Sequence, residues 1–159
     1  AVTALLFRVA EADPGGATLM GITQQTFDEA KQKGIIQPNV VLEELSKDQA
    51  RQIYKTMYWD AVSGDSLPWP IALATFDAAV NTGVSRAIAM LQQAVGTRID
   101  GIVGSATINA AAAASGDSLD RMLASRAIYY VDLAALKPSL LKYRFGWLRR
   151  CFTISRMSA

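Results

Sequence analysis

Apolar residues return at three- and four-residue spacing along most of the chain, and short breaks rich in Gly and Pro divide the pattern into segments. One stripe consists of Ala50, Ile53, Tyr54 and Met57, at positions i, i+3, i+4 and i+7. Residues 85–95 carry a second stripe of the same kind. This period predicts about seven helices, one short β ribbon or loop near the N-terminus and no long repeat. We therefore expect a mainly α fold.

Capping residues mark several of the expected helix ends. Thr23 is suited to cap a helix that runs to about Lys33, and Gly34 can follow as its C-terminal stop. Ser46 and Gln49 fit a capping box, in which each side chain bonds the backbone N–H of the other residue. These ends set off the apolar stripes as separate helices.

The C-terminal part predicts two further helices. A long helix opens at Asp117 and ends before Pro138, because proline cannot continue a helix. Pro138 is suited to start a last helix that ends at Arg150. The tail 152–159 shows no clear period, so we expect it to be irregular.

The side-chain inventory excludes several chemistries. The chain has 159 residues, of which 51% are hydrophobic, so it can bury a core. It contains no His, and its single Cys, Cys151, has no partner for a disulfide. Ser-His-Asp and Cys-His catalysis need an imidazole, and most catalytic zinc sites need His or Cys ligands. We therefore expect no metal site, with carboxylates as the main acid–base groups.

Charge and hydropathy narrow the class of partner. The 16 Lys and Arg residues exceed the 14 Asp and Glu residues by too little to indicate nucleic-acid binding. The apolar runs are too short to span a bilayer, and no export signal is visible at the start. We expect no nucleic-acid partner and no membrane span.

Two carboxylates lie beside a glycine-rich turn early in the chain. Glu11 and Asp13 stand two residues apart, just before Pro-Gly-Gly, and Thr18 follows closely. Neighbouring carboxylates can have their pKa values pushed apart, which provides an acid and a base, and glycosidases use such a pair. The alternative is a plain turn in which the Asp13 side chain bonds the backbone.

Aromatic and polar residues on later helices are candidates for substrate binding. Tyr58 and Trp59 can stack on sugar rings, although an aromatic helix stripe is more often part of the core. Asp77 and Asn81 lie at i and i+4 on an otherwise apolar helix. A polar pair there either anchors a structural network or lines a cleft, and spacing leaves both alternatives open.

Four sequence blocks resemble a known family. Residues 13–23, Asp-Pro-Gly-Gly-Ala-Thr-Leu-Met-Gly-Ile-Thr, resemble the "DPGG-x-T-x-x-GIT" signature of the secretion-activator-type N-acetylmuramidases of bacteria and phages. Residues 53–60 look like their "IY-x-x-x-YW" helix, and residues 76–83 look like their "FD-x-AVN-x-G" helix. Residues 91–107 are similar to their C-terminal region, which resembles small peptidoglycan-binding modules. The four blocks occur in the family's order.

The resemblance implies a lysozyme-like helical fold that cleaves the glycan strand of peptidoglycan without a cofactor. It divides the chain into a catalytic part, 1–82, and a C-terminal part, 83–159, resembling a peptidoglycan-binding module and packed with the first as one compact unit. Peptidoglycan is the expected partner and a monomer the expected state. The expected location is the bacterial cell envelope. The protein would reach it either as a phage lysin released through membrane pores or by an export signal that has been removed or is not part of this sequence.

The resemblance also assigns roles to the candidate residues. Asp13 and Thr18 would hold the attacking water or stabilise positive charge on the sugar, and Tyr58 and Trp59 would line the sugar cleft. Asp77 and Asn81 would support the cleft or contact the acetamido group.

The family's general acid is the Glu of an upstream "E-G-G-Y" motif, and that motif is absent here. Three explanations remain open: residues missing at the join of Val9 and Ala10, Glu11 acting as the acid in a shortened loop, or sugar binding without hydrolysis. A purely structural role in a secretion or phage assembly is a further alternative.

Overall fold

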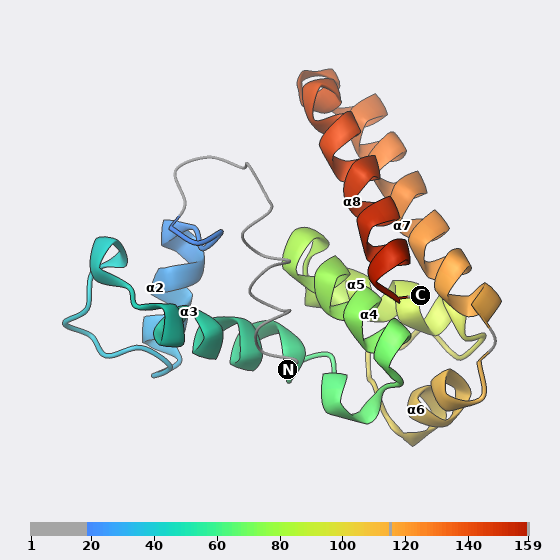
Figure 1. The fold of residues 1–159 in the computed structure, drawn as a ribbon, viewed down its shortest axis with the longest axis horizontal. Coiled ribbons are helices and arrows are strands. Elements are labelled where there is room, and N and C mark those ends of the chain that lie inside the picture. Colours follow the sequence, from blue (N-terminus) through green and yellow to red (C-terminus); the bar gives the residue numbers. More distant parts are fainter. Residues whose placement is uncertain (1–18, 115, 159) are drawn as a thin grey trace. The chain divides into compact units, whose positions relative to one another are not determined.

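The computed structural model describes residues 19–114 and 116–158, and most of these residues are helical (Figure 1). The expected mainly α fold is confirmed, since the described part contains the α-helices α2 to α8 and no strand longer than an isolated bridge. The α-helices span Gln24–Gln32 (α2), Lys47–Tyr54 (α3), Trp69–Thr82 (α4), Val84–Ala94 (α5), Ser105–Ala112 (α6), Gly116–Leu136 (α7) and Arg144–Ser158 (α8). Short 3₁₀ helices cover Leu42–Glu44, Gly64–Ser66 and Pro138–Tyr143, and a π-helical turn covers Lys55–Trp59.

The chain divides into two compact units, Ala1–Ala61 and Val62–Ala159. In the first unit, α2 has the boundaries that its capping residues predict. The backbone N–H of Thr26 donates to Thr23 Oγ1 at 3.2 Å, and Gly34 follows the helix with a φ of 70°. That left-handed conformation favours glycine, so the helix stops there. Phe27 and Ala30 are buried on its inner face.

The expected capping box at the start of α3 is confirmed. The N–H of Gln49 donates to Ser46 Oγ at 3.2 Å, and the N–H of Ser46 donates to Gln49 Oε1 at 2.9 Å. After Tyr54 the helix widens into the π turn, in which the N–H of Asp60 donates to the carbonyl of Lys55 at 2.9 Å. A π turn shifts the following side chains around the helix axis, and such turns are frequent at functional sites.

The expected β ribbon is represented, in the described residues, by one tight turn. Leu19 and Ile22 form an isolated antiparallel bridge, and the N–H of Ile22 donates to the carbonyl of Leu19 at 3.0 Å. Met20 and Gly21 both have positive φ values, 53° and 76°, the combination found in type I′ hairpin turns. This turn comes directly after Thr18.

In the second unit, α4 is the central helix. All residues from 71 to 79 are buried, and α5, α7 and α8 pack against α4. Four of those nine positions are Ala, which lets neighbouring helices approach closely. The helix therefore forms the core of this unit along most of its length.

The last helix is longer than its sequence pattern predicted. α8 continues to Ser158, so the expectation of an irregular tail is wrong for residues 152–158. Cys151 and Ile154 are buried, and they continue from Trp147 at spacings of four and three residues. Their packing in the second unit holds the segment helical. α7 and α8 form a hairpin whose closed end extends past α4 and α5 (Figure 1).

Candidate functional site

The three residues expected to carry the chemistry, Glu11, Asp13 and Thr18, lie outside the described residues, as does the join at Val9 and Ala10. The structure does describe the anchor that follows them. The hydroxyl of Tyr54, a buried residue of α3, donates to the carbonyl of Met20 at 3.1 Å. The turn after Thr18 is thus fixed both by its own bridge and by a side chain from α3.

Tyr58 lies beside hydroxyl groups of α2. Its side chain lies near that of Thr26, whose Oγ1 is 3.0 Å from Thr23 Oγ1. Burial and the nearby Glu29 carboxylate raise the pKa of Tyr58 above its ordinary value of 10.0, and the Thr26 contact only partly offsets this. The phenol therefore stays neutral at physiological pH and can both donate and accept a hydrogen bond.

Tyr58 and Trp59 differ in what they can offer to a ligand. Tyr58 is half-buried, and its ring is tilted against that of Tyr54 at 6.0 Å between centroids. Trp59, the last residue of the π turn, is only 3% exposed. Part of the Tyr58 side chain is therefore open to solvent, whereas the indole of Trp59 is covered.

Asp77 and Asn81 belong to α4, in the second unit, and Asp77 is completely buried. Its carboxylate pairs with Arg126 of α7 through Nη1. Arg150 of α8 donates to the same carboxylate from Nη2 at 2.7 Å and from Nε at 3.0 Å. Asn81 Nδ2 donates to the backbone carbonyl of Asp77 at 2.7 Å. This geometry favours the alternative of a structural anchor.

Arg126 is the most deeply buried cation of the described residues, with 1% exposure. Burial by itself lowers the pKa of a guanidinium, but Asp77, Tyr130 and Cys151 together outweigh it and hold the pKa of Arg126 above its ordinary value. Arg126 Nε also donates to the Tyr130 hydroxyl at 3.0 Å, and the Tyr130 ring stacks on Trp147 at 4.9 Å. Arg126 therefore stays charged, and the side chain of Tyr130 connects it to Trp147.

A second polar network holds the turn-rich loop between α5 and α6. The buried side chain of Gln92 donates from Nε2 to Asp100 Oδ1 at 2.8 Å and to the carbonyl of Ile102 at 3.0 Å. Its Oε1 accepts from the N–H groups of Asp100 and Gly101, at 3.1 Å and 3.0 Å. One amide therefore fixes three consecutive loop residues.

Sequence reasoning missed the partners of Asp77 and the role of Gln92. A sequence signal exists for Arg126 and for Gln92, because each is a polar residue within an apolar helix stripe. Arg126 stands midway between the buried Met122 and Tyr130, four residues from each, and Gln92 follows the buried Leu91. Such residues require buried partners, although spacing alone does not identify them.

Comparison with known proteins identifies both halves of the sequence. Residues 7–83 match the family model described as Glycosyl hydrolase 108, and residues 86–152 match the model described as a Predicted Peptidoglycan domain. The solved structure of Brucella abortus SagA is similar at 30% sequence identity with a TM-score of 0.78, covering 99% of this chain and 91% of that chain. No curated protein sequence matches.

These findings confirm the family resemblance of the four sequence blocks. They support a glycoside hydrolase with a lysozyme-like function, peptidoglycan as its partner and a role in the cell envelope. The similarity to SagA extends over both matched regions, so the two occur together in a relative of nearly the same length. The chain therefore belongs to the glycosyl hydrolase 108 family, with a peptidoglycan domain following the hydrolase domain.

Proposed function

We propose that this protein is an N-acetylmuramidase that cleaves the glycan strand of peptidoglycan by carboxylate general acid catalysis, without metal or cofactor. The match of residues 7–83 to glycosyl hydrolase 108 carries the proposal, because it spans the segment that contains Glu11, Asp13 and Thr18. The peptidoglycan domain over 86–152 supports the same polymer as the substrate. We assign catalysis to residues 1–82 and wall binding to residues 83–159.

In this proposal a carboxylic acid protonates the glycosidic oxygen as the bond to the sugar breaks. Glu11 is the candidate acid, being the only Glu before Asp13. Asp13 and Thr18 hold the attacking water or stabilise the positive charge that develops on the sugar ring. These roles require the segment to keep a fixed position during the reaction.

The described residues support that requirement. The turn after Thr18 is fixed by the Leu19–Ile22 bridge and by the Tyr54 hydroxyl. The residues that directly follow the candidate catalytic segment are therefore held in place. Tyr58 supplies a neutral phenol next to the Thr26 hydroxyl, a pair suited to the hydroxyl and acetamido groups of a sugar. Trp59 packs as a covered ring, and Asp77 and Asn81 contribute by anchoring α4.

The test is hydrolysis of purified cell-wall sacculi, followed as loss of turbidity and by the sugar found at the new reducing ends. A muramidase creates reducing ends on N-acetylmuramic acid. Glu11→Gln is expected to lower the rate by about 10²- to 10⁴-fold, the usual contribution of a general acid. Glu43→Gln removes an exposed carboxylate from a 3₁₀ helix and should leave the rate unchanged. Reducing ends on N-acetylglucosamine would contradict the proposed bond specificity, and full activity in Glu11→Gln would contradict the assigned acid.

The second candidate is a protein that binds peptidoglycan without cutting it, which the absence of an E-G-G-Y motif favours. It predicts that the protein sediments with sacculi while turbidity stays constant. An intact mass together with peptide mapping across Val9 and Ala10 tests the shortened loop directly. Extra residues that include a Glu at this join would transfer the role of acid from Glu11 to that residue.

A further inference from the structure

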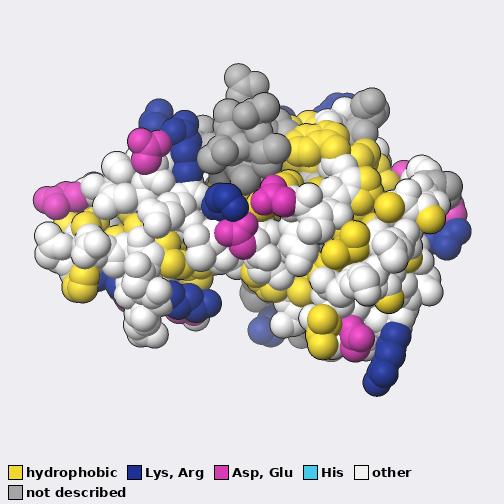
Figure 2. All heavy atoms as spheres, turned by 90° about the horizontal axis from the view of Figure 1, so that it is seen from below, with side chains coloured by type: hydrophobic (Ala, Val, Ile, Leu, Met, Phe, Trp, Pro, Cys, Tyr) yellow, Lys and Arg dark blue, Asp and Glu magenta, His cyan; other side chains and the backbone are white. Residues whose placement is uncertain are grey.

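The C-terminal end of the chain has a strongly one-sided charge. Residues 133–158 contain six of the 16 Lys and Arg residues and none of the 14 Asp and Glu residues. The rest of the chain is left with ten basic and 14 acidic residues, a net negative charge. On the face that Figure 2 shows, by contrast, Lys and Arg lie interspersed with Asp and Glu. Such an asymmetry indicates an anionic partner for the C-terminal end.

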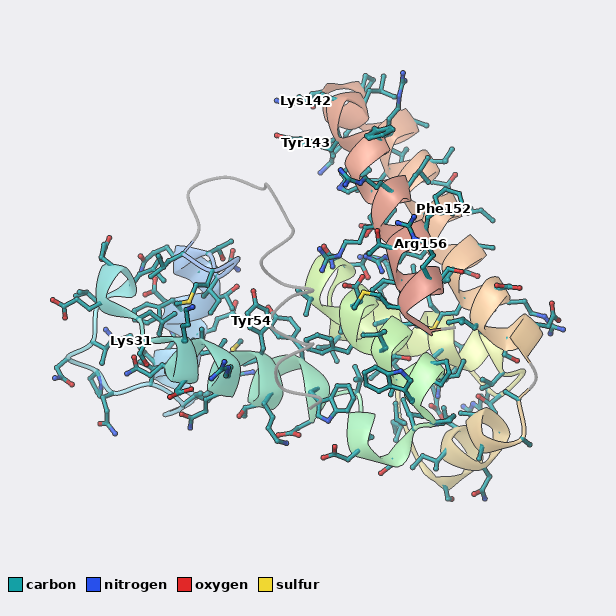
Figure 3. All side chains as sticks on the ribbon, in the orientation of Figure 1. Lys31, Tyr54, Lys142, Tyr143, Phe152 and Arg156 are labelled. Carbon is teal, nitrogen blue, oxygen red and sulfur yellow. The ribbon has the colours of Figure 1, made fainter. Side chains whose placement is uncertain are left out.

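The basic residues alternate with aromatic residues along one side of α8. Phe145, Arg149, Phe152 and Arg156 are spaced four, three and four residues apart, so they share one face of the helix. The two Phe side chains are 75% and 69% exposed, and both Arg side chains are exposed. We name these four residues the basic-aromatic face. Figure 3 shows Phe152 and Arg156 on α8, away from Lys142 and Tyr143 at the closed end of the hairpin.

The basic-aromatic face takes no part in the core of the second unit. Cys151 and Ile154 are the buried residues of α8, and Arg150 turns to the buried Asp77. The exposed Phe side chains therefore leave apolar surface in contact with water and do not stabilise the fold by burial. Neighbouring exposed aromatic side chains of this size indicate an interaction surface.

The closed end of the hairpin also exposes aliphatic side chains. Leu136 is 81% exposed and Leu141 is 42% exposed, with Lys137 and Lys142 beside them. A nucleic acid has a charged surface with no apolar phase to receive Leu side chains. A bilayer provides both phosphate groups and an apolar interior within a few ångströms.

We propose that the basic-aromatic face binds the surface of an anionic phospholipid bilayer. The helix lies along the interface, with Phe145 and Phe152 at the boundary of headgroups and acyl chains and with Arg149 and Arg156 against lipid phosphates. None of the helices in the described ranges is long and apolar enough to cross a bilayer. The basic-aromatic face would hold the protein at a membrane while residues 1–82 cleave the glycan strand.

The experiment is co-sedimentation of the full chain with vesicles of phosphatidylcholine alone or mixed with phosphatidylglycerol. We expect binding to the mixed vesicles only, and weaker binding as salt rises, because salt screens exposed charges. Arg149→Gln combined with Arg156→Gln should reduce the partition coefficient about 25-fold, given about fivefold for each charge near an anionic surface. Phe145→Ser combined with Phe152→Ser should reduce it about tenfold or more.

The matched control is Lys47→Gln combined with Arg98→Gln, which removes the same charge from exposed positions outside α8. This variant should bind vesicles like the unchanged protein. The Phe and Arg variants should keep the thermal unfolding midpoint, since the four side chains are exposed, and this excludes loss of folding as the cause.

Four results would overturn the proposal: no binding to the mixed vesicles, equal binding to neutral vesicles, unchanged binding in the α8 variants, or an equal loss in the control. The α8 variants are also tested with sacculi and by sedimentation velocity. If these variants lose wall binding or self-association while vesicle binding stays absent throughout, the face serves peptidoglycan or a second copy instead. The vesicle readout does not depend on hydrolysis, so it separates this proposal from the catalytic one.

Discussion

Asp77 and Arg126 form a buried ion pair between residues 49 positions apart in sequence. Asp77 lies in the region that matches glycosyl hydrolase 108, and Arg126 lies in the region that matches the peptidoglycan domain. Both belong to the same compact unit, which starts at Val62. The last helix of the hydrolase match therefore packs as the core of the C-terminal unit, and the family boundary near residue 83 is not a packing boundary.

Replacing Asp77 by Asn should destabilise the protein strongly. The change leaves Arg126 buried without its counter-charge, and removing one partner of a buried pair costs about 3–5 kcal/mol. Urea unfolding monitored by circular dichroism measures the change in the free energy of unfolding. Asp60→Asn is the control, because Asp60 pairs with Lys55 at 2.5 Å on the surface, where such pairs contribute about 0–1 kcal/mol. Equal effects of the two substitutions would show that Asp77 is not an anchor.

Gln92→Leu should loosen the loop between α5 and α6. The substitution keeps a similar volume but removes both donors and the acceptor that hold residues 100–102. We expect a loss of about 1–3 kcal/mol, since partly buried hydrogen bonds to the loop backbone are lost. Amide hydrogen exchange should quicken at Asp100 and Gly101 and change little in α4. Gln93→Leu, at the exposed neighbouring position, is the control and should leave exchange in the loop unchanged.

Asp100 should titrate below its ordinary value of 3.8. The hydrogen bond from Gln92 and that from the N–H of Ile102 favour the charged carboxylate and lower its pKa. The stabilising contribution is therefore present above about pH 4 and is lost as the pH falls through the lowered pKa. An NMR titration of the side-chain carboxyl measures the midpoint. In Gln92→Leu the midpoint should rise, and an unchanged midpoint would rule out the amide as the main cause.

Tyr54→Phe should affect catalysis more than folding. The substitution removes the hydrogen bond to the carbonyl of Met20, and a hydrogen bond is worth about 0.5–1.5 kcal/mol of stability. The turn after Thr18 loses its anchor on α3, so hydrolysis of sacculi should fall by a larger factor than the fraction of folded protein. Ile53→Val, which trims the buried neighbour by one methyl group at a similar stability cost, is the control. Equal activities of the two variants at equal stability would contradict the positioning role.

Local sequence signals predicted the helices well where capping residues were present. Thr23, Ser46 and Gln49 act through hydrogen bonds to residues three positions away, so their effect is visible in a short window. The end of α8 was missed because Cys151 and Ile154 are stabilised by packing within the second unit. Tertiary contacts of that kind override a weak local pattern.

The candidate site was predictable only in part. Residue types at Tyr58 and Asp77 indicated polar or aromatic roles, but the choice between ligand contact and internal anchor depends on residues far along the chain. Asp77 receives its partners from 49 and 73 positions away, a separation at which sequence spacing carries no information about contact. Tyr58 lies near Thr26 of α2, 32 positions earlier in the chain.

Gln92 holds the loop mainly through the loop's backbone. The conformation of the loop therefore depends little on the side chains that it presents to solvent. Apart from the Asp100 carboxylate, the contacts of Gln92 in residues 100–102 are to main-chain N–H and carbonyl groups. Ile99 and Ile102, which are 58% and 67% exposed, add only their outward side chains. Relatives can therefore exchange residues at these two positions and present a different surface on an unchanged backbone. The loop is therefore a suitable place for substitutions, natural or engineered, that leave folding intact.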